Sequence, residues 1–480
     1  MSRLYPTLRF VLRSALGIYF FDIRATGQEK IPEDGPLIFA ANHPNSIMDT
    51  VLLGSQTERQ IRYMARSGLF ENPVVRAVFN HFGVIPIYRS HDPGGDTSKN
   101  STSFDKAFEA LEEGGCIGIF PEGKNSPERM VQKLKTGTAR IALSTEERND
   151  FALGVRIQPV GLNFEDRDRF LSSVLIRFGE PIDVSEYADR YASDPRGTVR
   201  QLTDRLQERM RALATHIEDE RNHKLVSDIY DLYGRKMTRG LLDDLDLQLD
   251  LYQREGRQER LASERSAKAR AALEDRFDRE QRIADAVDYY QRTDPGLVAR
   301  IRMDIRRYRD HLSQLQVRHA LLEKGFSNTG RRRDAVRMTT YAVLLGPVAI
   351  FGLLNNLIPA AIVRQVTRRQ PDEAMVAFAG FLTGLIGFPL FYTLQGWALW
   401  TVTDQSLVVV ILYLLALPIT GLFFLRWWRQ ILAYRERILF RTFFRSEKGL
   451  IDTLERERLE LIDTFEDLKN RYLRAMKNKS

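Results

Sequence analysis

Three long stretches near the C-terminal end of the chain contain no charged residue, whereas the middle of the chain is densely charged. The uncharged stretches are Met338–Val363, Ala374–Thr403 and Gln405–Leu425. Each is long enough to cross a bilayer as a helix, which takes roughly 20 apolar residues. Because three such runs in succession are rare in soluble proteins, the pattern predicts an integral membrane protein.

The first third of the chain alternates short apolar runs with helical patterns, which is typical of an α/β domain with a mainly parallel sheet flanked by helices. The predicted strands are Pro36–Ala41, Ile61–Ala65, Val84–Tyr88, Cys116–Phe120, Arg156–Asn163 and Val174–Phe178. The predicted helices are Asp49–Leu53, Pro73–Asn80, Phe104–Glu113 and Thr138–Glu146. Ligands of such sheets bind beyond the carboxyl ends of the strands, so motifs at those ends carry most weight.

The pattern divides the chain into five regions. They are an N-terminal interfacial amphipathic helix (1–26), the α/β domain (27–198), a charged helical region (199–330), a membrane region with two to three apolar segments (331–430), and an amphipathic helical tail (431–480). The charged region favours a solvated helical bundle over a partner-binding arm.

The charges around the apolar segments indicate their topology. Arginines fill positions 331–333 before the first segment and recur between 364 and 369 after it, so both of its ends are drawn to the cytoplasmic side. Asn355 and Pro359 inside this segment suit a re-entrant or broken helix. The link between the other two segments contains only one charge, Asp404, which suits a hairpin. We expect two full spans and one re-entrant or interfacial segment, with the α/β domain on the cytoplasmic side.

The amino-acid composition limits the classes of molecule that the chain is expected to bind. The chain has 71 basic and 63 acidic residues, a net charge of +8, which suits a negatively charged partner such as anionic lipid or a phosphorylated metabolite. Nucleic acid is disfavoured, because the positive charge flanks the apolar segments and no base-reading motif is present. The single cysteine excludes an intrachain disulfide framework and a Cys-rich zinc site. No metal and no cofactor is expected.

The first predicted strand runs into Asn42-His43-Pro44-Asn45-Ser46-Ile47-Met48-Asp49. A histidine with a pKa near neutrality can take the proton of an attacking hydroxyl, and a carboxylate beside it fixes its tautomer. On a regular helix the six-residue step from His43 to Asp49 would leave the two side chains about 120° apart. The turn must therefore be irregular, and Ser46 is expected to cap a helix that begins near Ile47.

Three further clusters follow at later strand ends. Gly83–Arg89 ends in a guanidinium, the side chain best shaped to grip a phosphate. Phe120–Ser126 includes Gly123, where a ligand can approach the backbone closely. Ile157–Gly161 completes the set.

The order and content of these four blocks resemble the glycerolipid acyltransferase superfamily, over about Ile31–Pro181. By that resemblance region 27–198 is an acyltransferase domain, His43 is its general base and Asp49 orients the base. The resemblance also implies that the acceptor's phosphate and glycerol contact Arg89, Glu122 and Gly123. Finally, it implies that Ser126 supports the loop and that Lys133 and Lys135 add phosphate contacts.

The five residues between His43 and Asp49, where four are usual in the superfamily, resemble the glycerol-3-phosphate/dihydroxyacetone-phosphate acyltransferase branch. The resemblance implies acyl transfer from acyl-CoA or acyl carrier protein to glycerol 3-phosphate or dihydroxyacetone phosphate in phospholipid synthesis. One alternative is a lysophosphatidate or lysophospholipid acyltransferase. A catalytically degenerate membrane scaffold is an alternative of another class, against which the intact His43, Asp49, Arg89 and Glu122 argue.

Overall fold

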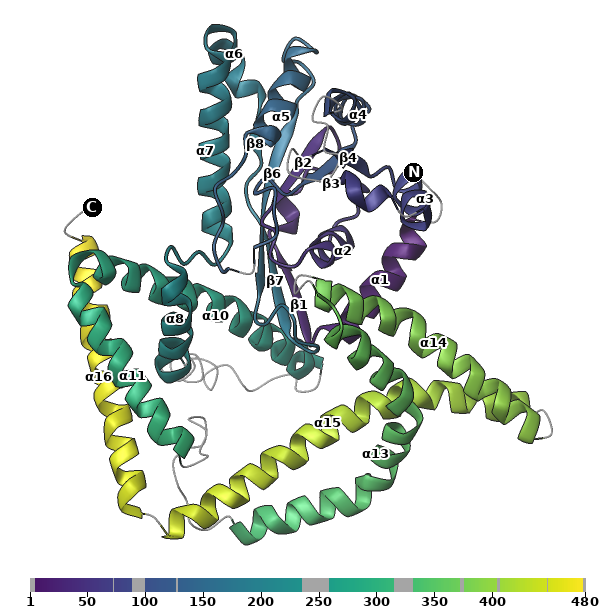
Figure 1. Cartoon of the computed structure of the whole chain (residues 1–480), viewed down its shortest axis with the longest axis vertical. Coiled ribbons are helices and arrows are strands. Elements are labelled where there is room, and N and C mark those ends of the chain that lie inside the picture. Colours follow the sequence, from purple (N-terminus) through teal and green to yellow (C-terminus); the bar gives the residue numbers. More distant parts are fainter. Residues whose placement is uncertain are drawn as a thin grey trace. The chain divides into compact units, whose positions relative to one another are not determined.

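The structure is a computed structural model that describes residues 5–71, 73–88, 100–126, 128–234, 259–314, 331–371, 375–403, 406–446 and 448–477. The chain forms two compact units (Figure 1). The first contains residues 1–220, 256–281 and 370–381, and the second contains residues 221–255, 282–369 and 382–480. A short piece of the membrane region, residues 370–381, therefore belongs to the unit that holds the α/β domain.

The first unit is built on one sheet with the strand order β1-β7-β6-β2-β5-β3-β4, and β8 pairs with β6. Its strands are β1 (Asp22–Thr26), β2 (Leu37–Ala41), β3 (Ile61–Arg66), β4 (Ile85–Ile87), β5 (Cys116–Ile119), β6 (Arg156–Phe164), β7 (Ser173–Phe178) and β8 (Ile182–Asp183). All pairings are parallel except those of β6 with β7 and with β8. The predicted mainly parallel α/β fold is confirmed, with all six predicted strands in place.

Helices cover both faces of the sheet, and Figure 1 shows α5 and α7 on one side and α1 and α2 on the other. The helices of this unit include α1 (Tyr5–Tyr19), α2 (Ile47–Ser55), α3 (Pro73–His81), α4 (Asn100–Glu112), α5 (Gly137–Glu147), α6 (Ala188–Ser193) and α7 (Pro195–Leu213). Ile38, Ile117 and Ile157 of the strands form one core with Leu143 and Leu206 of the helices. This core anchors the strand ends that carry the motifs.

The predicted boundary between residues 198 and 199 lies inside α7. This helix starts sharply, because the Asp194 side chain accepts a hydrogen bond from Gly197 N at 2.9 Å and Pro195 occupies the first turn. Leu202, Leu206 and Met210 on its buried face belong to the domain core. The compact unit accordingly continues past the predicted boundary to residue 220.

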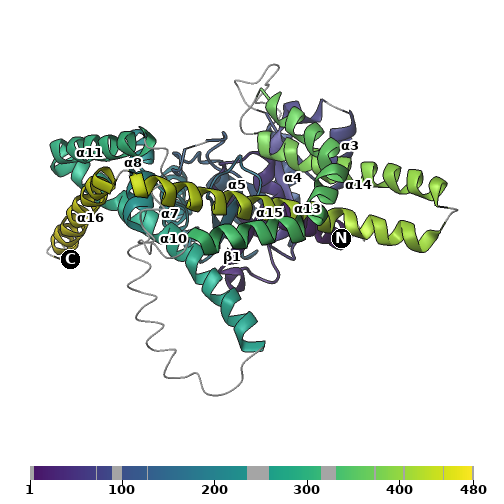
Figure 2. The same ribbon diagram turned by 90° about the horizontal axis from the view of Figure 1, so that it is seen from below.

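The second unit is helical. It contains α8 (His223–Ile229), the end of α10 (Glu259–Thr293), α11 (Pro295–Gln314), α13 (Arg331–Arg368), most of α14 (Val376–Val402), α15 (Leu407–Ser446) and α16 (Lys448–Lys477). In the described part of the chain three helical stretches are long and apolar enough to cross a membrane: Met338–Arg368, Met375–Val402 and Leu407–Leu432. Figure 2 shows α14 and α15 as a hairpin. Positions 235–258 and 315–330 of the predicted charged region lie outside the described residues.

Helices α13 and α15 pack closely and run antiparallel. A Cβ atom at Gly352 would lie 2.1 Å from the carbonyl oxygen of Thr420, so the two backbones touch there. Further along, Trp427 Nε1 donates to Tyr341 O at 3.4 Å. Small residues at such crossings let apolar helices approach each other, which is how helices associate inside a bilayer.

The break expected near Asn355 does not occur, because α13 runs unbroken from Arg331 to Arg368. Its two asparagines instead connect the helices. Asn355 Oδ1 accepts from Tyr413 of α15 at 2.7 Å, and Asn356 Oδ1 accepts from Tyr392 of α14 at 2.5 Å. The polar residues that suggested an interruption therefore hold three apolar helices together.

The C-terminal helix α16 packs against α11, and the two lie side by side in Figure 1. His311 Nδ1 of α11 lies 3.0 Å from Glu457 Oε2 of α16. The hydroxyl of Tyr290, in α10, donates to Leu468 O at 2.9 Å. The segment after the last apolar helix thus contacts segments that precede the first one.

Candidate active site

His43 and Asp49 meet at the carboxyl end of β2. His43 Nδ1 donates to Asp49 Oδ2 at 2.9 Å, since an ionised carboxylate can only accept. Asp49 is fully buried, and the His43 side chain keeps 15% of its surface exposed. With Nδ1 bound to the carboxylate, the histidine is left with Nε2 for a reacting group, which is the arrangement that a general base needs.

The turn between these residues is irregular, as their spacing requires. Ser46 has φ 49° and ψ −129°, a positive φ that a residue with a side chain rarely adopts, and α2 begins at the next residue. Asp49 Oδ2 also accepts from the backbone N–H of Asn45 at 2.7 Å. The strained residue therefore lets the chain fold back so that Asp49 reaches His43.

The predicted capping role of Ser46 is wrong. Its side chain makes no hydrogen bond to the start of α2, because the positive φ turns it away from the helix. Ser46 Oγ instead donates to Met375 Sδ at 3.5 Å. Met375 stands at the head of α14, in the same compact unit, so the catalytic turn is in contact with the start of an apolar helix.

The His43 ring is held by aromatic stacking. Phe120 lies almost parallel to it, with ring centroids 3.9 Å apart and an interplanar angle of 14°. The ring of Tyr63 is also nearly parallel to Phe120, with centroids 6.3 Å apart, and its hydroxyl donates to Thr50 O at 2.9 Å. The stack fixes the imidazole plane while the hydrogen bond to Asp49 fixes its rotation.

Glu122 is buried beside this pair, with 4% of its surface exposed. Its carboxyl accepts from the backbone N–H of Gln132 at 3.2 Å and from that of His43. Its pKa is raised from 4.5 to about 7, mainly by burial and also by the nearby Asp49, against the two backbone hydrogen bonds and Lys124, which lower it. Glu122 is thus a carboxyl that changes charge near neutral pH.

Asp49 is subject to opposing influences. Burial is the largest influence and the pKa of Asp49 lies above its ordinary value, although the hydrogen bonds from His43 and from the Asn45 N–H, together with the positive charge of Arg167, lower it in part. These three interactions all favour the ionised carboxylate that the histidine needs as its partner. A protonated His43 would strengthen its own hydrogen bond to Asp49, so the carboxylate would stabilise an imidazolium at this position.

The loop after β5 closes over the His43 backbone. Ser126 N donates to His43 O at 3.1 Å, and Ser126 Oγ accepts from Gln132 Nε2 at 3.1 Å. Gly123 has φ 72°, and a Cβ atom there would lie 2.8 Å from Lys135 Nζ. The positive φ favours glycine at this position, and the missing side chain allows Lys135 to lie across the loop.

The structure brings together most of the predicted site residues. His43, Asp49, Glu122 and Ser126 are linked directly by the contacts above, and Gly123 and Lys135 join them through the loop. Lys133 is exposed, and none of the contacts recorded for the described residues ties it to the His43–Asp49 pair. Arg89 lies outside the described residues.

Several supporting residues were not predicted. Asn42 uses its amide like a backbone group: Nδ2 donates to Leu162 O at 3.0 Å and Oδ1 accepts from Leu162 N at 2.7 Å, which joins the end of β2 to β6. Arg167 donates to Pro44 O at 3.2 Å and supports the turn from below. Its position in a loop after β6 offers no sequence signal, whereas Asn42 was visible as part of the motif.

Comparison with known proteins agrees with this geometry. Residues 22–163 match the family model described as Acyltransferase. This domain belongs to the glycerolipid acyltransferase superfamily. Within the described ranges the acyltransferase domain and its neighbours contain no group of three or more His, Cys, Asp or Glu side chains that could hold a metal ion.

Three curated relatives illustrate the match. Glycerol-3-phosphate O-acyltransferase 1 of Saccharomyces cerevisiae is 22% identical over 48% of this chain and 42% of its own length. Glycerol-3-phosphate O-acyltransferase 2 of the same yeast is 34% identical over 22% and 14% of the two chains. A chloroplastic 1-acyl-sn-glycerol-3-phosphate acyltransferase of Arabidopsis thaliana is 26% identical over 32% and 39%. The chain spans less than half the length of each of them.

The raised pKa of Glu122 predicts a pH-dependent stability. The pKa of this carboxyl is near 4.5 in the unfolded chain and about 7 in the folded chain. Between pH 4.5 and pH 7 the folded chain therefore holds a proton that is released on unfolding. Stability therefore falls as pH rises through this window, by up to about 3 kcal/mol. Glu122→Gln should remove this loss, so that its advantage in unfolding temperature over the wild type grows from pH 5 to pH 7.5.

Thiol labelling of Cys116 measures this unfolding within the acyltransferase domain, because the only cysteine of the chain is buried in β5. The variant and the wild type are compared at each pH, so that the intrinsic reactivity of the thiol cancels. Glu147→Gln, which removes an exposed carboxyl from α5, is the matched control and should follow the wild type. Parallel pH profiles of wild type and Glu122→Gln would contradict the assignment.

Proposed function

We propose that the protein is a membrane-bound O-acyltransferase that moves a fatty acyl group from an acyl thioester to the hydroxyl of a glycerol phosphate. In this reaction His43 Nε2 takes the proton of the acceptor hydroxyl as its oxygen attacks the thioester carbonyl. Collapse of the tetrahedral intermediate forms the ester and expels the thiolate, which receives the proton back from the imidazolium. Asp49 stabilises the imidazolium in between.

The observation that carries the proposal is the hydrogen bond from His43 Nδ1 to the buried carboxylate of Asp49, at 2.9 Å. It requires a strained residue at position 46, and strain of this kind is concentrated at functional sites. The match of residues 22–163 to the acyltransferase family supports the same reaction. A catalytically degenerate scaffold would have no need for a His43–Asp49 pair that so many contacts hold in place.

The acceptor is proposed to be glycerol 3-phosphate or dihydroxyacetone phosphate, with acyl-CoA or acyl carrier protein as donor. Support comes from the two yeast relatives that are named glycerol-3-phosphate O-acyltransferases. Lys135 lies across Gly123 close to Glu122 and offers a cation for the acceptor's phosphate, and Arg89 at the end of the β4 segment is proposed as a second one. The plant relative is named a 1-acyl-sn-glycerol-3-phosphate acyltransferase, so 1-acylglycerol 3-phosphate remains the alternative acceptor.

His43→Ala should abolish acyl transfer, with a loss of roughly 10² to 10⁴ in turnover, since general base catalysis is worth this much. The test is a radiolabelled transfer assay in detergent that offers glycerol 3-phosphate, dihydroxyacetone phosphate and 1-acylglycerol 3-phosphate side by side. Lys106→Ala, which changes an exposed residue of α4, is the control and should stay active. Normal turnover in His43→Ala would exclude His43 as the general base. If the wild type released no thiol with any acceptor, the scaffold alternative would be favoured.

Arg89→Ala should raise the KM for the phosphate-bearing acceptor by tenfold or more while the KM for the thioester changes little, because a guanidinium binds a phosphate through charged hydrogen bonds. Steady-state kinetics with each substrate varied in turn separates the two constants. A similar rise in both would remove Arg89 from the phosphate site.

We also propose that only α14 and α15 cross the membrane fully, with the acyltransferase domain on the cytoplasmic side. Helix α16 packs against α11, so the segments before α13 and after α15 share one side and the number of crossings is even. Met375, just after α13, contacts Ser46 of the acyltransferase domain, which supports the same side for that domain and the C-terminal end of α13. No long uncharged stretch separates the domain from the N-terminal end of α13, so this end is proposed to lie on the same side. The arginines at both ends of α13 support the same side, which the positive-inside rule makes cytoplasmic.

Single cysteines test this arrangement by labelling vesicles with a membrane-impermeant maleimide. Pro371→Cys should react from the same side as Glu147→Cys, an exposed position of the acyltransferase domain, and Ser406→Cys should react from the opposite side. The parent chain is a suitable background because its one cysteine is buried. Labelling of positions 371 and 147 from opposite sides would mean that α13 crosses the membrane.

A further inference from the structure

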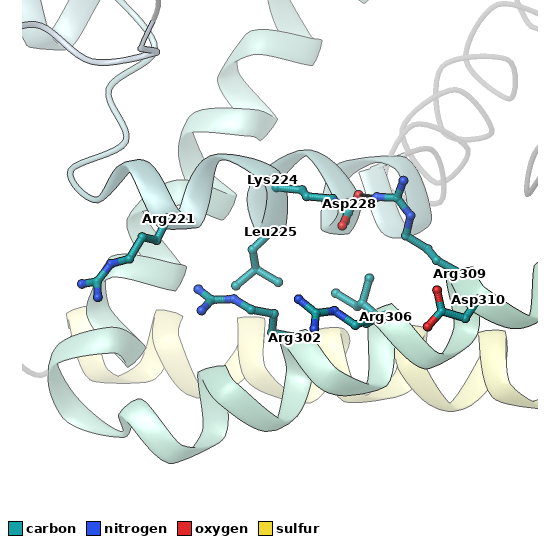
Figure 3. Close-up of a pocket in the computed structure, with 9 residues that line it drawn as sticks. Arg221, Lys224, Leu225, Asp228, Arg302, Arg306, Arg309 and Asp310 are labelled. Carbon is teal, nitrogen blue, oxygen red and sulfur yellow. Dashed lines mark hydrogen bonds and ion pairs between the residues drawn. The ribbon is translucent and has the colours of Figure 1, made fainter. Parts of the chain in front are cut away.

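The second unit contains a cavity of about 550 Å³ between α8 and α11, and no residue of the His43–Asp49 site lines it. Figure 3 shows its two walls, with α8 above and α11 below. Five of the residues that line it are cationic: Arg221, Lys224, Arg302, Arg306 and Arg309. Two are carboxylates, so the lining has a formal excess of three positive charges.

Asp228 does not neutralise the centre of the cavity. Asp228 is in a close ion pair with Arg309 at one end, where Figure 3 shows the two side chains together. Arg302 donates to the neutral amide oxygen of Asn222 at 2.8 Å and keeps its charge. In Figure 3 the guanidinium groups of Arg302 and Arg306 both point into the space between the helices.

The arginines are spaced along α11 so that their positive charges repel one another. Arg302 and Arg306 are four residues apart and Arg309 follows three later, so like charges stand side by side on one face, which destabilises an isolated helix. A bound anion would offset this repulsion, because a phosphate oxygen accepts bidentate hydrogen bonds from guanidinium groups. The arrangement is the one expected of an anion site.

The floor of the cavity is apolar. Leu225 of α8 and Ile305 of α11 line it and are almost completely buried, with 4% and 1% of their surface exposed. A purely structural basic surface needs no hollow of this size. An apolar floor below a cationic rim fits a ligand that carries a phosphate group and an apolar part.

We propose that the groove between α8 and α11 is a second, non-catalytic site that binds a phosphate group, carried by a soluble phosphate ester or by an anionic lipid headgroup. The site is independent of the proposed acyl transfer, because it shares no residue with it. Arg302 and Arg306 grip the phosphate, and Lys224 adds charge from the opposite wall.

The test compares two double variants of the full chain in neutral detergent. R302Q/R306Q removes two charges from the groove. R300Q/R307Q removes two arginines from the same helix, about 130° around its axis at 100° per residue, and is the matched control. R302K/R306K keeps the positive charges but replaces the planar guanidinium groups, which form two parallel hydrogen bonds, with ammonium groups. Circular dichroism confirms that all variants keep their helix content.

Calorimetric titration with inorganic pyrophosphate tests the soluble source, and native mass spectrometry of mixed micelles with anionic or neutral phospholipid tests the lipid source. Binding in either arm should weaken at least tenfold in R302Q/R306Q, partly in R302K/R306K, and not in R300Q/R307Q. The arm that responds identifies the source. The proposal is overturned if the two double variants behave alike in both arms, or if the wild type binds neither probe.

Discussion

The site depends on one hydrogen bond, from His43 Nδ1 to Asp49 Oδ2. The two residues are six positions apart, a separation that a regular helix would place on different faces. The chain solves this with a positive φ at Ser46, after which α2 starts and turns Asp49 back toward the imidazole. The strain at one backbone position is thus the condition for the catalytic pair, and the surrounding contacts must hold it in place.

Those contacts come from parts of the sequence that lie far apart. Arg167 donates a hydrogen bond to Pro44 O, and Ser126 N donates one to His43 O. The ring of Phe120 stacks on the imidazole of His43. Met375, at the head of α14, touches the strained residue itself. This last contact joins the turn between His43 and Asp49 to the start of an apolar helix that is long enough to cross a membrane.

Much of the fold could be predicted from local patterns. All six predicted strands were found, and a fully buried strand such as β2 leaves the strongest signal. β1 is only half-buried and β8 has two residues, so neither has a pattern of its own. The asparagines of α13 suggested a broken helix, since their partners Tyr392 and Tyr413 are distant in sequence and only tertiary packing reveals them.

The pairing of His43 with Asp49 and the irregular turn between them could also be predicted from the sequence, whereas the contacts that support them could not. Ser46 was expected to cap a helix, but the side chain of a residue with positive φ points elsewhere. The most direct measurement of the central claim is acyl transfer by Asp49→Asn. The account predicts that turnover falls at least a hundredfold while both KM values stay close to those of the wild type, because the imidazole loses its orienting charge. Turnover equal to that of the wild type would contradict it.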